Sequence, residues 1–295
     1  MDSSLGSRSR VGRRRAVWRR VLCAAVVAAL GCAAAPAGAV ADPGAMKILK
    51  WKQGFRFRPP GEPELILWYW FYEWNLFGAV KPRLISKGLS GRLEPSGTEA
   101  GGTLALAPGL TLHALPVFDG IELSLTARNQ SARPWPELAS VIPCLSPQNR
   151  SRNTPNFVTK KTWFFGEDGL ELVVDRGRWR AIHFNRRFRP AIDARSRNGR
   201  FPWSRRWRTS SSDAERGILV RESVDGEWVM GAAWERFLSA QANNSSKCLH
   251  LSVRIGPLAV GESRVVRGKL YLLRGSREDL LKRYEEEFGS PTSLP

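Results

Sequence analysis

The chain has 295 residues, of which 46 are basic and 27 acidic, giving a formal net charge of +19, and it has four cysteines. This length allows one large domain or two small ones, each with a sizeable core. The sequence contains no phosphate-binding loop, no dinucleotide fingerprint and no Gly-x-Ser-x-Gly motif. It therefore predicts no cofactor, and it gives no support to nucleotide-dependent or serine-hydrolase chemistry.

Residues 1–41 have the pattern of an export signal. Seven arginines precede an apolar run over residues 21–35, and residues 39–41 offer a small-residue cleavage site. The apolar run is too short to span a membrane. Cys32 resembles a lipobox cysteine, but Ala29 stands where leucine is expected, so cleavage is favoured over lipidation. We expect a secreted or periplasmic mature chain without a transmembrane span; losing seven basic and one acidic residue leaves it at +13.

Two segments follow the signal before the clear strand patterns begin. Residues 42–63 are rich in Lys, Arg, Gly and Pro, which predicts an irregular arm, while residues 64–295 are predicted to form a single domain. Residues 65–80 are aromatic and read as a strand, with Trp70 on one face and Glu73 on the other. Because aromatic rings stack on sugar rings, Trp70 and Glu73 are candidate ligand contacts. The alternative is that most of these rings belong to the core.

Residues 218–273 carry the clearest strand signals. Asp225-Gly226 separates two apolar runs, which predicts a hairpin with a two-residue type I′ turn and Arg221 opposite Met230. Neither face of this hairpin is polar throughout, as expected of a sheet covered on both sides or one with a polar groove. The candidate site residues on the hairpin are Arg221, Glu222, Trp234 and Glu235.

Strict alternation continues over residues 248–255, where apolar side chains share one face and Cys248, His250 and Arg254 share the other. Residues 120–128 alternate in the same way. Ser276 is a good N-cap for a helix over residues 276–288, and Gly289 suits its C-terminal stop. The sequence therefore predicts a mainly β protein, an antiparallel β-sandwich with a C-terminal α-helix.

Several strings resemble known proteins. LWYWFYEWNLFGAV, VIPCLSP, GILVRESVDGEWVMGAAWERFLSAQ and CLHLSVRIGPLAVGESRVVRGKLYLLRGSREDLLKRYEEEF resemble a family of secreted bacterial proteins of unknown function, over most of the chain after about residue 50. More loosely, DGIELSLTARNQS and PLAVGES are similar to pieces of the galactose-mutarotase-like β-supersandwich. That second resemblance implies a supersandwich-like fold of the kind common in carbohydrate-active proteins. The Asn-His motif of mutarotases has no recognisable match here, which puts their activity in doubt.

Residues 176–208 contain twelve arginines, no lysine and one acidic residue, Asp193, interleaved with aromatic residues. Guanidinium groups bind carboxylate, sulfate and phosphate through two parallel hydrogen bonds. In an exported protein the available polyanions are acidic polysaccharides and envelope glycans. The pattern also fits single-stranded nucleic acid, but the export signal argues against that partner. An ordinary arginine-rich surface is the alternative. The candidate contacts on this basic aromatic surface are Arg186, Arg187, Trp203 and Arg205, with Arg254 added from the later strand.

Chemistry on a sugar would need a carboxylate with a second acid or base. The candidate base is Glu222 or Glu235, with His250 as its partner, in an epimerase, lyase or hydrolase. The sequence does not decide between such an enzyme, a protein that binds acidic glycans, and a structural or protein-interaction module.

Only Cys144 and Cys248 remain after signal cleavage. In an oxidising compartment they can form one disulfide; the alternative is two buried thiols. No close His and Cys spacing of the zinc type occurs, so the sequence predicts no metal site.

Overall fold

The computed structural model describes residues 44–51, 54–76, 93–95, 101–107, 109–147, 157–173, 175–176, 179–194, 207–242 and 247–289. The chain divides into two compact units, residues 1–37 and 38–295, and all described residues belong to the second. The predicted signal peptide over residues 1–41, with Cys32, lies outside the described residues. No helix in the described ranges is long and apolar enough to cross a membrane.

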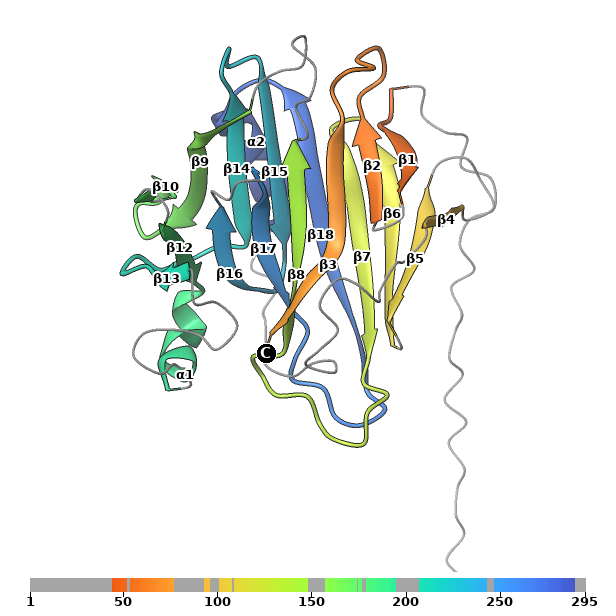
Figure 1. Cartoon of the computed structure of the whole chain (residues 1–295), viewed down its shortest axis with the longest axis vertical. Coiled ribbons are helices and arrows are strands. Elements are labelled where there is room, and N and C mark those ends of the chain that lie inside the picture. Colours follow the sequence, from red (N-terminus) through yellow and green to blue (C-terminus); the bar gives the residue numbers. More distant parts are fainter. Residues whose placement is uncertain are drawn as a thin grey trace, which may run out of the picture. The chain divides into compact units, whose positions relative to one another are not determined.

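The described strands form two large sheets, antiparallel except for one pair (Figure 1). Sheet A has the order β1 (Lys47–Trp51), β2 (Gly54–Arg58), β3 (Leu67–Leu76), β8 (Ser140–Pro147), β17 (Leu249–Arg254), β16 (Phe237–Ala242), β12 (Trp179–Phe184) and β11 (Asp175–Arg176), with β13 (Trp207–Thr209) parallel to β12. Sheet B has the order β10 (Gly169–Leu172), β9 (Phe157–Gly166), β14 (Ile218–Ser223), β15 (Trp228–Trp234), β18 (Ser263–Arg274), β7 (Gly120–Arg128), β6 (Leu110–Val117), β5 (Gly102–Ala107) and β4 (Leu93–Pro95). The predicted mainly β, antiparallel fold class is confirmed.

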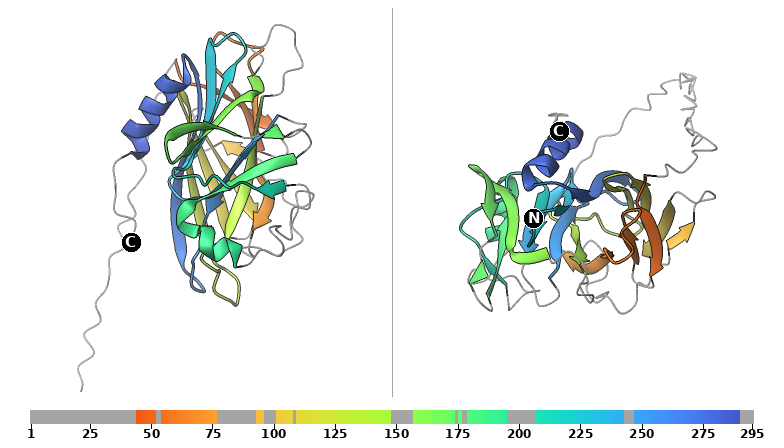
Figure 2. Two further views of the ribbon diagram at one scale, coloured as in Figure 1. Left: turned by 90° about the vertical axis from the view of Figure 1, so that its left-hand side faces the viewer. Right: turned by 90° about the horizontal axis from the view of Figure 1, so that it is seen from above.

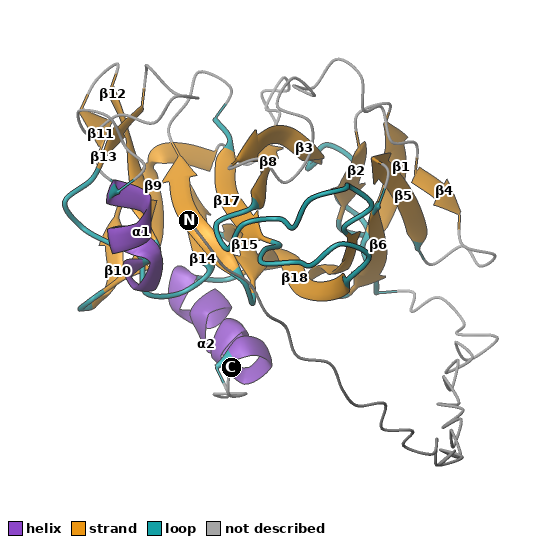
Figure 3. Ribbon diagram, turned by 90° about the horizontal axis from the view of Figure 1, so that it is seen from below, coloured by secondary structure: helices purple, strands orange, loops and turns teal. Residues whose placement is uncertain are grey.

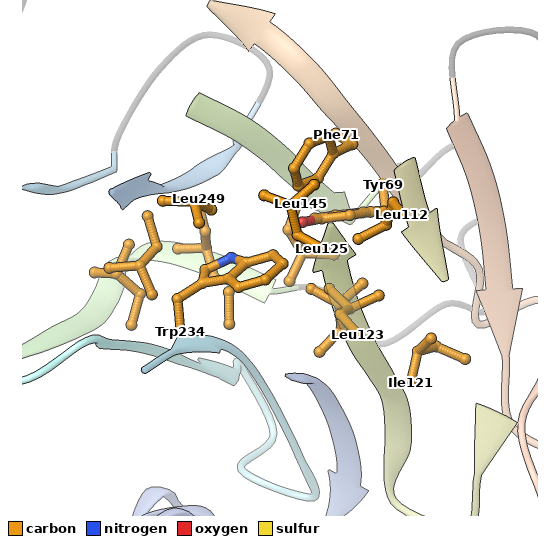
Figure 4. Packing of buried hydrophobic residues seen from close by; sticks show 14 of the residues in the cluster. Tyr69, Phe71, Leu112, Ile121, Leu123, Leu125, Leu145, Trp234 and Leu249 are labelled. Carbon is orange, nitrogen blue, oxygen red and sulfur yellow. The ribbon is translucent and has the colours of Figure 1, made fainter. Parts of the chain in front are cut away.

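The main core lies between the two sheets. Each sheet turns one face inward, so that alternate apolar residues of β3, β8 and β17 meet those of β6, β7 and β15. Figure 4 shows Trp234 of β15 among Phe71, Leu145 and Leu249 of sheet A. A Cβ atom on Gly268 of β18 would lie 2.4 Å from the Trp234 ring, so glycine is needed there for the indole to pack. We call the face toward the other sheet the inner face and the opposite one the outer face.

The arm predicted as irregular over residues 42–63 contains two paired strands instead. β1 and β2 form an antiparallel hairpin at the edge of sheet A. Phe55 and Phe57 of β2 are fully buried in the main core, while Arg56 between them lies on the outer face. The alternation is only five residues long and is flanked by Gly and Pro, which hid it in the sequence.

The hairpin of β14 and β15 has the predicted register, with Arg221 opposite Met230. Its turn is different from the prediction. Gly226 has a φ of +76°, but Asp225 is not among the residues with positive φ, and a type I′ turn needs both. The turn occupies residues 224–227, and the Asp225 carboxylate accepts a hydrogen bond from Ser223 Oγ and another, at 3.1 Å, from the Glu227 backbone N–H.

Helix α2 (Arg277–Phe288) covers the outer face of sheet B, as Figures 2 and 3 show. Ser276 and Asp279 form a capping box at its start, and Leu280 and Tyr284 are buried against β14, β15 and β18. Gly289 ends the helix with a right-handed φ of −77° rather than a left-handed stop. The predicted helix is therefore confirmed. Two short helical segments, η1 (Arg186–Phe188) and α1 (Arg189–Asp193), pack Phe188 and Ile192 on the outer side of sheet A.

A cluster of charges ties α2 to sheet B, and we call it the acid–base cluster. Lys269 Nζ of β18 lies 2.9 Å from an Asp119 carboxylate oxygen and 2.5 Å from one of Glu287. Arg283 of α2 lies 3.3 Å from the other Asp119 oxygen, and the Tyr271 hydroxyl donates to Glu287 at 2.7 Å. Lys269 and Asp119 are almost fully buried. Every charge in this cluster therefore has an opposite charge beside it.

Candidate anion-binding site

A pocket of about 1010 Å³ lies where the turn between β15 and β16 meets η1, β18 and the end of α2. Its lining is strongly basic, and we call it the arginine pocket. Three glutamates line it, Glu215, Glu235 and Glu287, against seven arginines: Arg186, Arg187, Arg216, Arg236, Arg254, Arg264 and Arg267. The aromatic residues Phe188, Phe237, Tyr284 and Phe288 supply much of the remaining lining.

The hydrogen-bonded strands place two of these arginines side by side. Arg236 follows the end of β15, Arg254 ends β17, and the Arg254 backbone N–H donates to the Arg236 carbonyl oxygen at 2.9 Å. Both guanidinium groups then donate to the carbonyl oxygen of Gly256, at 2.9 Å from Arg236 and 2.8 Å from Arg254. Their positions are therefore fixed by the backbone before any ligand arrives.

The carboxylates of the pocket are already engaged by other groups. Glu235 accepts from the Arg267 Nε at 3.0 Å and from its backbone N–H at 2.8 Å. Glu215 lies 2.5 Å from Arg186, and Glu287 belongs to the acid–base cluster. Arg216 and Arg264 form ion pairs with Glu285 and Glu262, which do not line the pocket.

Three arginines keep an unneutralised charge: within the described part of the chain, Arg187, Arg236 and Arg254 form no ion pair with a carboxylate. Arg254 is only 6% exposed, and the Nε atoms of Arg236 and Arg254 have no hydrogen-bond partner there. The Arg254 guanidinium stacks at 4.3 Å on the ring of Phe188, whose other neighbour, Arg187, lies 5.6 Å from the same ring. Arg236 is half-buried and Arg187 is exposed. A buried cation without an ion-pair partner is costly, so the position of Arg254 favours a bound anion.

The pKa values of Arg254 and Arg236 are lowered mainly by burial, and the Glu137 carboxylate partly opposes this shift in both. Burial lowers the pKa of Arg254 to about 10, and the neighbouring Arg236 lowers it further in the same direction. Burial also lowers the pKa of Arg236, with Arg264 as the next contribution. An anion placed among these groups would raise both pKa values, because an opposite charge favours the protonated guanidinium.

Four of the predicted site residues lie together in this pocket: Arg186, Arg187, Glu235 and Arg254. Their roles differ. Arg186 is committed to Glu167 and Glu215, each at 2.5 Å, and Glu235 holds Arg267. Arg187 and Arg254 remain available to a ligand.

Two predicted contacts are interior residues. Arg221 is fully buried on the inner face of β14, where it donates to Thr162 Oγ1 at 2.7 Å and to the Lys247 carbonyl oxygen. Burial lowers the pKa of Arg221 to about 9. Trp234 is 1% exposed in the core. Because both side chains are buried, neither is available to an external ligand. Arg221 can face inward despite its charge because a threonine hydroxyl and a backbone carbonyl accept its hydrogen bonds.

The proposed catalytic pair is not brought together. Glu222 lies on the outer face of sheet B and accepts from the Arg277 backbone N–H at 3.2 Å, at the start of α2. His250 lies on the outer face of sheet A, opposite in register to Gln241. The whole sandwich separates these two residues. His250 is also absent from the lining of the arginine pocket, which contains Glu235.

The other predicted contacts lie elsewhere or outside the description. Trp70 is half-buried on the outer face of β3, and its register partner is Cys144. The side chain of Glu73 is outside the described set, as are Trp203 and Arg205 altogether. Cys144 and Cys248 are joined by a disulfide, with their Cα atoms 5.6 Å apart.

Sequence reasoning missed four pocket arginines, Arg216, Arg236, Arg264 and Arg267. All four lie outside the arginine-rich segment: Arg216 precedes β14, Arg236 lies between β15 and β16, and Arg264 and Arg267 belong to β18. A signal did exist, because a hairpin turn after Trp234 places Arg236 at the same end of the sheet as Arg254. Strand alternation alone does not say which ends of which strands meet.

Comparison with known proteins finds a likeness among solved structures. No protein-family model matches the chain, and no curated protein does. Among solved structures, the chain is similar to a crystal structure from Escherichia coli K12 named "Putative aldose 1-epimerase", with 10% sequence identity and a TM-score of 0.35. The match covers 78% of this chain and 99% of that one. At this similarity the likeness supports no statement about activity, so the function is argued from the residues themselves.

Proposed function

We propose that this protein is an exported binding protein for acidic glycans, which it holds in the arginine pocket. The observation that carries the proposal is the group of Arg187, Arg236 and Arg254, which have no carboxylate partner within the described residues while the acids of the pocket are engaged elsewhere. Guanidinium groups recognise carboxylates and sulfates through paired, charge-assisted hydrogen bonds.

The size and lining of the pocket favour a sugar over a small inorganic anion. A volume of about 1010 Å³ is at the upper end of ordinary ligand pockets and far exceeds a sulfate or phosphate ion. Phe288 and Tyr284 stack on each other at 5.5 Å beside the cationic groups. Aromatic faces next to arginines suit a ring that carries both C–H faces and an acidic group. An exported chain would meet such rings in acidic polysaccharides.

The test uses a matched pair of polymers that differ only in charge, dextran sulfate and neutral dextran, together with polygalacturonate as a carboxylate polymer. The protein should bind both acidic polymers and not dextran, and raising the salt concentration should weaken binding. The variant Arg236→Gln/Arg254→Gln should bind each acidic polymer at least about a hundredfold more weakly, since each lost charged hydrogen bond typically contributes about tenfold.

Arg274→Gln is the control, because it removes one positive charge away from the pocket. Arg274 is 60% exposed, and it ends β18, away from the pocket residues Arg264 and Arg267 near the start of that strand. It should change binding by less than about threefold, as expected for an exposed charge. Unchanged binding of the acidic polymers by the double variant would show that they bind at another site. Binding to single-stranded DNA that exceeds binding to both polymers would overturn the glycan assignment.

A further inference from the structure

A second group of chemically reactive side chains lies on sheet A, away from the arginine pocket. Cys144, Cys248 and His250 are all buried, and their sulfur and ring nitrogen atoms lie within 4.8 Å of one another. His250 precedes Arg254 by four residues on the same face of β17, a separation of about 13 Å along a strand. None of the three residues lines the arginine pocket.

The strand register explains why these three residues meet. β8 and β17 are antiparallel with Leu249 opposite Leu145, so Cys144 lies opposite His250 and Cys248 lies diagonally beside it. All three therefore point to the outer face of sheet A, while Leu145 and Leu249 point into the core. Because the backbone positions are held by the hydrogen-bonded ladder, the three side chains stay close whether or not the sulfurs are bonded.

A fourth polar residue lies next to this group. Gln241 of β16 is directly opposite His250 on the same face, and it is fully buried. Neither its Oε1 nor its Nε2 has a hydrogen-bond partner within the described residues. A buried amide with both atoms unsatisfied costs free energy and suits a ligand that supplies the missing contact.

We infer that reduction of the Cys144–Cys248 disulfide converts this group into a binding site for a thiolate-preferring metal ion, with Zn²⁺ as the representative ion. A dithiol of the surroundings supplies two electrons and two protons, which break the S–S bond and give two thiols while the dithiol becomes a disulfide. The metal ion then displaces the two thiol protons and is bound by two thiolates and the neutral imidazole of His250. The amide oxygen of Gln241 is the candidate fourth ligand.

The dimensions agree with this assignment. Zn–S and Zn–N bonds of about 2.3 and 2.0 Å place tetrahedral ligand atoms about 3.3–3.8 Å apart. The present group spans no more than 4.8 Å, so side-chain rotations suffice and the strands need not move. The two states exclude each other, because the sulfurs either bond to each other or coordinate the ion. Strand alternation placed Cys248 and His250 on one face, but the sequence gave no sign that Cys144 joins them, since the two cysteines are separated by 104 residues.

Cobalt(II) is the probe, because its bonds to thiolate give a charge-transfer absorption. The full mature protein, reduced with a phosphine, should take up one Co²⁺ per chain with this absorption, and Zn²⁺ should displace it. The unreduced protein should show no absorption. His250→Ala should weaken Co²⁺ binding at least about tenfold, and Cys144→Ser should abolish it.

His113→Ala is the matched control. His113 is exposed on β6 of sheet B, where it is hydrogen-bonded to Thr103 at 2.8 Å, whereas the cysteines lie on sheet A. It should bind Co²⁺ as the wild type does. A melting curve for each reduced variant, recorded with and without Zn²⁺, checks folding, and Zn²⁺ should raise the wild-type melting temperature. Reduced wild-type protein without the absorption, or His250→Ala binding as tightly as wild type, would overturn the inference.

Discussion

The arginine pocket and the acid–base cluster both concentrate charge beside α2, yet they are built on opposite principles. In the cluster, Lys269 lies between Asp119 and Glu287, so the charges are matched inside the protein. In the pocket, Arg236 and Arg254 share a carbonyl oxygen and have no carboxylate partner in the described chain. The difference teaches that charge density by itself does not mark a site. The unmatched charge does, because it remains to be matched by a ligand.

The largest expected effect comes from breaking the matched cluster. Lys269→Met would leave Asp119 and Glu287 without their buried cation, and breaking such a pair costs about 3–5 kcal/mol. Denaturant unfolding measures the loss. The comparison variant is Arg274→Gln, whose two ion pairs are largely exposed and should contribute at most about 1 kcal/mol. A loss below about 1 kcal/mol for Lys269→Met would remove the distinction between the two regions.

A second prediction concerns a buried side chain that is uncharged, in contrast to the paired charges of the acid–base cluster. His183 stacks on Phe164 at 3.8 Å, donates from Nδ1 to the Ser212 carbonyl oxygen, and has its pKa lowered to about 4 by burial. The unfolded chain binds a proton near pH 6.5 and the folded chain only near pH 4, so stability falls as the pH is lowered between these values. The loss should approach about 3 kcal/mol.

Unfolding of wild type and His183→Gln from pH 7 to pH 4 checks this prediction. The variant should lose the part of the acid sensitivity that His183 causes, even if it is less stable at pH 7. Parallel pH curves for the two proteins would show that His183 is not the group responsible.

A smaller effect should follow from loosening the helix that borders both regions. Ser276 Oγ accepts from the Asp279 backbone N–H at 3.2 Å, and the Asp279 carboxylate accepts from the Ser276 N–H at 2.8 Å. Ser276→Ala should lower the free energy of unfolding by about 1 kcal/mol, as loss of an N-cap usually does. Binding to dextran sulfate should be unchanged, because the cap lies at the end of α2 away from the pocket. Weakened binding would mean that the helix start also orders the site.

The smallest stability change is expected in the unmatched region. Arg254→Met removes a buried cation that has no counter-charge, but it also loses the bond to Gly256 and the stacking on Phe188. These contributions oppose each other, so the free energy of unfolding should change by less than about 1 kcal/mol. Set beside Lys269→Met, this variant sharpens the comparison. A loss of about 3 kcal/mol or more would identify Arg254 as a structural residue.

Much of the fold was predictable because alternation directly records which side chains face a core. The alternation over residues 248–255 gave β17 and its two faces, and the apolar runs around Asp225 gave the β14–β15 register. The β1–β2 hairpin was missed, since Phe55 and Phe57 alternate over too few residues to be distinguished from a loop. Asp225 was misjudged because the pair Asp-Gly is common in type I′ turns but does not enforce one.

The site was less predictable for a physical reason. Composition nominated Arg186 and Arg187, and strand alternation nominated Arg254, but neither could tell which cations the fold would neutralise. Arg186 is paired and Arg254 is not, and the difference depends on where Glu215 is placed by a distant part of the chain. Arg221 shows the same difficulty in reverse, as its charge suggested an exposed contact and the fold buried it entirely.

The carbonyl oxygen of Gly256 has one more consequence. It holds Arg236 and Arg254 by one hydrogen bond each, at 2.9 and 2.8 Å, so a single backbone atom sets the interval between two positive charges. The two guanidinium groups are therefore held at a fixed spacing. Polymers whose negative groups repeat at the matching interval would engage both arginines at once, whereas equally charged polymers with another repeat would engage only one.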